Sequence, residues 1–69
     1  SYAISYNLAL SMQLAGRLED ALLQYEKTLA IRETRAVYVN MAICYTNLGD
    51  EETANEYYAI AEELRTSGR

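Results

Sequence analysis

The amino-acid sequence predicts an all-α fold in which two helix-turn-helix hairpins stack on each other. Three observations carry this prediction: an internal repeat, a glycine at the same place in each copy, and apolar residues at helical spacing. Aligning the first half of the chain with the second superimposes eight identical pairs: Ala3/Ala36, Asn7/Asn40, Ala9/Ala42, Gly16/Gly49, Glu19/Glu52, Ala21/Ala54, Tyr25/Tyr58 and Arg32/Arg65. A repeat of this length is typical of stacked helical units, so we expect one domain over residues 1–69, with repeat one at 2–34 and repeat two at 35–67.

The first repeat is expected to hold helices at 2–15 and 18–32. Apolar residues recur at helical spacing in the first of these, at Ile4, Leu8, Met12 and Ala15. The same spacing continues in the second, at Leu18, Ala21, Leu22, Tyr25 and Leu29. Gly16 stands between the two helices and is expected to form the turn, because glycine readily ends a helix.

The second repeat is expected to hold helices at 35–48 and 51–65, with Gly49 at the turn. Its apolar positions are Val37, Met41, Cys44 and Leu48, then Ala54, Tyr57, Tyr58, Ala61 and Leu64. Thr34 and Asp50 have side chains suited to cap the two helix starts. Gly68 is expected to mark the end of the last helix.

The link between the repeats, residues 32–35, contains neither proline nor glycine. Two outcomes follow from the missing helix breaker. Either the chain turns here and the hairpins stack, or residues 18–48 run on as one continuous helix. The second outcome would open the hairpins and favour a domain-swapped dimer.

The composition excludes several kinds of site. The single cysteine, Cys44, excludes an intramolecular disulfide, and the absence of histidine excludes a zinc site of the usual kind. A net charge of −4 argues against nucleic acid, and polar residues interrupt the uncharged stretch 1–16 too often for a membrane span. We therefore expect a cytoplasmic protein that uses no metal, no cofactor, no nucleic acid and no membrane.

Catalytic motifs are missing as well. The sequence has no glycine-rich phosphate loop and no Ser/His/Asp or Cys/His set. Its carboxylates stand in adjacent pairs, such as Glu62 and Glu63, and adjacent helical residues do not face each other. We expect a chain that is not an enzyme.

One family has a consensus close to this repeat. The second copy reads Tyr38, Met41, Ala42, Tyr45, Gly49, Asp50, Ala54, Tyr58 and Ala61, and the first reads Ser5, Leu8, Ala9, Met12, Gly16, Ala21, Tyr25 and Thr28. This order of residues resembles the tetratricopeptide repeat over nearly the whole chain. Ser5 departs from the family's aromatic, Glu33 from its proline, and the repeat is one residue shorter than usual. The resemblance implies a fragment of an α-solenoid that serves as a protein-interaction scaffold.

The resemblance also implies a concave groove between the first helices of the two repeats, which would hold a peptide or helix of a protein partner. The residues expected to line it are Tyr6, Asn7, Leu10, Gln13, Val39, Asn40, Ile43 and Asn47. Asn40 either hydrogen-bonds a ligand backbone, as in many relatives, or it bonds a neighbouring helix or is a solvated side chain. Relatives that grip acidic peptide tails have lysine and asparagine where this chain has Tyr6 and Leu10, so we expect an apolar ligand and no carboxylate clamp.

The alternative function is self-association, without a foreign ligand. The first helix carries no charge, whereas the last helix is polar where a following repeat would pack. The residues expected to carry self-association are Tyr2, Ile4, Leu8 and Met12. We expect this face to meet a second protomer, giving a homo-oligomer, or the continuation of a longer repeat array.

Overall fold

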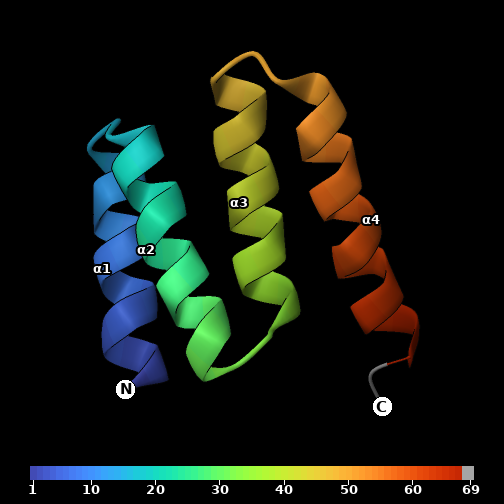
Figure 1. Ribbon diagram of the computed structural model, residues 1–69, viewed down its shortest axis with the longest axis horizontal. Coiled ribbons are helices and arrows are strands. Elements are labelled where there is room, and N and C mark those ends of the chain that lie inside the picture. Colours follow the sequence, from blue (N-terminus) through green and yellow to red (C-terminus); the bar gives the residue numbers. More distant parts are fainter. Residues whose placement is uncertain (68–69) are drawn as a thin grey trace.

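The computed structural model describes residues 1–67, which form four α-helices and no strands. These are α1 (Tyr2–Leu14), α2 (Leu18–Ile31), α3 (Arg35–Asn47) and α4 (Glu51–Ser67). Helix α1 packs against α2, and α3 against α4, while contacts between α2 and α3 join the two hairpins. Figure 1 shows the helices as a row with α1 at one end and α4 at the other. The predicted all-α fold of two packed hairpins is confirmed, with every described helix end within two residues of its predicted place. Gly68 lies outside the described residues.

Both hairpin turns end a helix with a glycine in the left-handed region. Gly16 has a φ of 81° and Gly49 a φ of 88°. In each turn the glycine N–H donates to the carbonyl three residues back, and the next N–H donates to the carbonyl five residues back: Gly16 to Gln13, Arg17 to Met12, Gly49 to Thr46 and Asp50 to Tyr45. This pair of bonds satisfies carbonyls that the helix end leaves free. The two predicted turns are therefore the same motif, repeated.

The predicted caps are also in place. The Thr34 hydroxyl accepts from the backbone N–H of Val37 at 3.3 Å, and the Asp50 carboxylate accepts from that of Thr53 at 3.1 Å. Each bond satisfies one of the N–H groups that a helix start leaves without a partner.

The link between α2 and α3 is not helical, so the alternative of one continuous helix over residues 18–48 is wrong for this chain. Arg32 and Thr34 both have extended backbone, with φ of −163° and −138°. Side chains hold the break: the Thr34 hydroxyl lies 2.7 Å from the Tyr2 hydroxyl, and Tyr38 donates to Glu33 at 2.8 Å. The turn lets α3 fold back on α2 and bury apolar surface that a continuous helix would expose.

One buried cluster joins the two hairpins. Its members come from α1, α2 and α3, and they are Ala9, Ala21, Leu22, Tyr25, Val37, Met41 and Cys44. Ala9 and Ala21 in the first hairpin, and Ala42 and Ala54 in the second, have no exposed surface. Small side chains at these places let the paired helices approach closely.

Candidate functional site

The eight residues predicted to line a groove all lie on α1 or α3, and we call them the α1–α3 surface. Six are half-buried, namely Tyr6, Leu10, Gln13, Val39, Asn40 and Ile43. Asn7 and Asn47 are exposed. The described residues enclose no pocket.

Asn40 connects the two helices of this surface. Its amide nitrogen donates to the Tyr6 hydroxyl at 2.9 Å and to the backbone carbonyl of Ala36 at 3.1 Å. The helix-to-helix bond, one of its predicted roles, is thus present. Neither bond uses the amide oxygen of Asn40, and that oxygen can accept a bond from a ligand N–H.

Tyr6 and Gln13 also take part in the core beneath the surface. The Tyr6 ring stacks on Tyr2 with centroids 5.8 Å apart and tilts against Tyr25 at 6.1 Å. The Gln13 side-chain oxygen accepts from the Tyr25 hydroxyl at 2.6 Å. Burial raises the pKa of Tyr25 above its usual range, so this hydroxyl stays protonated as the donor. The polar ends of both residues are therefore engaged, which leaves Leu10, Val39 and Ile43 as the apolar part of the surface.

The residues predicted for self-association do not share one environment. Ile4 is 72% exposed and Leu8 is 46% exposed. Tyr2 and Met12 instead pack against the buried cluster, and the Arg32 guanidinium lies 4.9 Å from the Tyr2 ring centroid. Ile4 and Leu8 are thus the exposed members of the predicted set, whereas Tyr2 and Met12 are half-buried.

Ser11 completes this exposed part of α1 and was not among the predicted residues. We call Ile4, Leu8 and Ser11 the outer face of α1. The signal in the sequence was the repeat itself, because aligning the two copies places Ser11 on Cys44, an apolar core position.

The described residues offer little to catalysis or metal binding. Within residues 1–67 no group of histidine, cysteine and carboxylate side chains could hold a metal ion. Cys44 is fully buried, and burial raises the pKa of its thiol, which disfavours the reactive thiolate. None of the helices in this part of the chain has the length and apolar character needed to cross a membrane.

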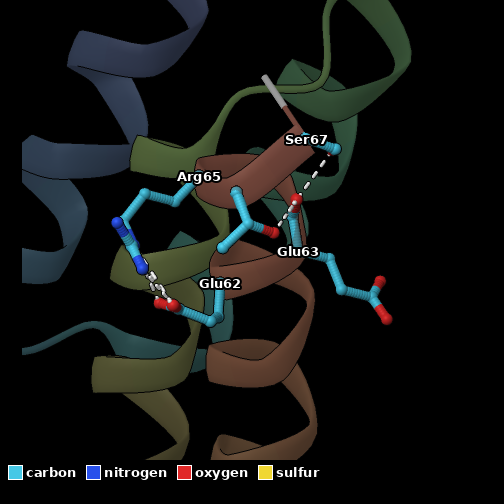
Figure 2. Close-up of polar contacts among 5 residues, drawn as sticks. Glu62, Glu63, Arg65 and Ser67 are labelled. Carbon is cyan, nitrogen blue, oxygen red and sulfur yellow. Dashed lines mark hydrogen bonds and ion pairs between the residues drawn. The ribbon is translucent and has the colours of Figure 1, made fainter. Parts of the chain in front are cut away.

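The polar contacts at the end of α4 are local. Figure 2 shows the Arg65 side chain reaching back to Glu62, while the Ser67 hydroxyl donates to the Glu63 backbone carbonyl at 2.7 Å. The hydrogen bond from Arg65 holds the pKa of Glu62 below its usual value. Glu62 and Arg65 are both exposed, so this ion pair contributes little to stability.

Comparisons with known proteins returned no match to a family model, a curated protein or a solved structure. The resemblance to the tetratricopeptide repeat therefore stays a prediction from the sequence. The function has to be argued from the two surfaces described above.

Proposed function

We propose that this chain is a protein-interaction module that binds an apolar peptide or helix along the α1–α3 surface, as a repeat of the tetratricopeptide kind. The observation that carries the proposal is that Leu10 of α1 and Val39 and Ile43 of α3 are half-buried apolar side chains. The hydrogen bond from Asn40 to Tyr6 links these two helices. Half-buried apolar groups on adjacent helices give a ligand area to cover without unfolding the module.

The chemistry of the surface favours an uncharged ligand. Helix α1 has no charged residue, and the single charged residue of α3, Arg35, stands at its first position. A ligand with an apolar stripe would cover Leu10, Val39 and Ile43, and one of its N–H groups would donate to the amide oxygen of Asn40. We propose no catalytic role, and the proposed setting is the cytoplasm, because the single cysteine supports no intramolecular disulfide.

A peptide-display screen followed by calorimetric titration tests this proposal. Leu10→Lys and Ile43→Lys should each weaken binding of a selected peptide by at least about tenfold, because a buried charge without a partner opposes apolar contact. Leu23→Lys is the matched control, since Leu23 is 61% exposed on α2, away from the α1–α3 surface. Circular dichroism verifies that each variant is folded. The proposal is wrong if Leu23→Lys abolishes binding while the other two variants bind normally.

Self-association, the alternative function, stays a prediction, and Ile4 and Leu8 are the exposed residues of its predicted set. A screen without selected peptides, together with a stable oligomer in sedimentation that Leu8→Glu dissolves, would favour it over the proposal above.

A further inference from the structure

The outer face of α1 is exposed where the equivalent face of α3 is fully covered. Ile4 and Leu8 are 72% and 46% exposed, and Ser11 is exposed too. Their counterparts in the second repeat are Val37, Met41 and Cys44, and each of these has 0% exposure. The two faces have the same place in their repeats, so their difference comes from what packs on them.

Helix α2, with a smaller contribution from α1, covers the face of α3. Leu22 belongs to the same buried cluster as Val37, Met41 and Cys44, and Leu18 and Leu29 pack against that cluster. These three leucines fall four and seven residues apart, which places them on one side of a helix. The structure thus shows which chemistry suits a face of this kind: an amphipathic helix with a leucine stripe.

We propose that the outer face of α1 is a second docking site, which binds a helix of a partner protein with leucines at the spacing of Leu18, Leu22 and Leu29. The incoming helix would lie on Ile4, Leu8 and Ser11 as α2 lies on Val37, Met41 and Cys44. Figure 1 shows α1 at the end of the row, where no described helix lies on the far side from α3.

The α2 and α4 helices of a second copy of this chain are poorer occupants than such a partner helix. Its α2 already uses the leucine stripe against its own α3. Its α4 has Glu51, Asn55 and Glu62 at the equivalent places, and all three are exposed. Laying these polar groups on Ile4 and Leu8 would remove them from water without offering partners, which is unfavourable.

A synthetic peptide of residues 17–33 is the probe, because its helix is the one that fits the equivalent face of α3. The experiment titrates this peptide into the isotopically labelled protein and follows backbone amide shifts. We expect the shifts to concentrate at Ile4, Leu8 and Ser11. Leu8→Glu in the protein should weaken binding by about tenfold or more.

Matched controls distinguish binding at this site from non-specific binding of the peptide. Leu23→Glu alters an exposed leucine on α2, outside the outer face of α1, and should leave binding of the probe unchanged. A peptide with Leu22→Gln and Leu29→Gln keeps a similar helix propensity but loses the stripe, so it should not bind. Leu10→Lys, which is directed at the α1–α3 surface, should not change binding of the probe either. The proposal for that surface and the proposal for the outer face of α1 are therefore tested independently.

A tandem chain provides a second measurement if the free peptide is too short to form a helix. Residues 1–33 placed directly before Ser1 put a second α2 at the repeat distance from α1. This chain should melt at a higher temperature than the same tandem with Leu22→Gln and Leu29→Gln in the added unit, and amide exchange at Leu8 should slow.

Three results would overturn the proposal. The first is no amide shift with the peptide together with equal melting of the two tandem chains. The second is a set of shifts centred on Val37, Met41 and Cys44, since the peptide would then be displacing α2. The third is a homodimer of the protein alone that covers Ile4 and Leu8, which would make the occupant a second copy.

Discussion

A chain of three hydrogen bonds lies inside the first hairpin, where the second hairpin has aromatic rings. The Gln24 amide donates to the Ser5 hydroxyl at 2.9 Å, and the Ser5 and Thr28 hydroxyls lie 2.6 Å apart. The Thr28 hydroxyl donates its single proton to the Gln24 carbonyl, so Ser5 must be the donor to Thr28. In the second repeat, Ser5 and Gln24 correspond to Tyr38 and Tyr57, whose rings pack 6.1 Å apart.

Removing one hydroxyl from this series of hydrogen bonds should lower the free energy of unfolding more than removing both. Thr28→Val keeps the shape of the fully buried Thr28 but leaves the Ser5 hydroxyl without an acceptor, which should lower the free energy of unfolding by about 1–3 kcal/mol. Adding Ser5→Ala should recover part of that loss, because the buried Ser5 hydroxyl without an acceptor is then gone, and the half-buried Gln24 amide that donated to it can turn to water. Urea unfolding of the two single variants and the double variant measures the coupling. If the losses of unfolding free energy in the two single variants add up to the loss in the double variant, the two hydroxyls act independently.

The buried tyrosines should make the fold sensitive to alkali. Burial raises the pKa of Tyr38 from its ordinary 10.0 to about 12, and its hydrogen bond to Glu33 adds to the shift. The folded state holds the phenolic proton more tightly than the unfolded state, so this part of the stability is complete below pH 10 and is lost as pH rises to about 12. Burial raises the pKa of Tyr25 as well, with the same sign.

Tyr38→Phe should therefore flatten the alkaline fall in stability. Each tyrosine that loses its proton on unfolding lowers the free energy of unfolding by up to about 1.4 kcal/mol for each unit that the pH rises. Urea unfolding at a series of alkaline pH values measures the slope, and Tyr58→Phe, at an exposed position, is the control. An unchanged slope in Tyr38→Phe would contradict this assignment.

At the scale of the helices, local chemistry was enough to predict most of what the structure shows. The spacing of apolar residues predicted the four helices, and Gly16 and Gly49 predicted the two turns. The capping side chains of Thr34 and Asp50 predicted where α3 and α4 begin. The break at residues 32–34 was left open, since it depends on contacts distant in sequence, such as that between Tyr2 and Thr34. The packing of Tyr2 against the buried cluster depends on contacts of the same distant kind.

The turn at Gly49 permits a test of purely local energetics. A Cβ at this position would meet no atom within 4 Å, so any cost of a side chain comes from the φ of +88°. Gly49→Ala should destabilise the fold by about 1–2 kcal/mol. D-alanine at the same place, introduced by chemical synthesis, should be at least as stable as glycine because it favours positive φ. Equal melting temperatures for the L- and D-alanine chains would show that the turn has changed its conformation.

At the scale of the molecule, the two ends of the row differ in chemistry. The outer face of α1 presents Ile4 and Leu8, whereas α4 replaces the α2 stripe with Glu51, Asn55 and Glu62. The sequence predicted this asymmetry, because comparing two copies of one repeat shows which positions changed class. It did not predict how deep the α1–α3 surface is, since depth depends on how far each half-buried side chain is covered by its neighbours.

This asymmetry should be what keeps copies of the chain from stacking end to end. Asn55→Leu with Glu62→Leu would rebuild most of the leucine stripe of α2 on α4, which then fits the outer face of α1 in another copy. That contact joins different faces of successive copies, so it does not close and should give open chains. In sedimentation velocity the double variant should show a series of species that grow with concentration. Leu8→Glu added to the same chain should remove them, because it alters only the receiving face. A double variant that sediments like the parent chain at every concentration, or one that Leu8→Glu leaves associated, would show that the polarity of α4 does not control stacking.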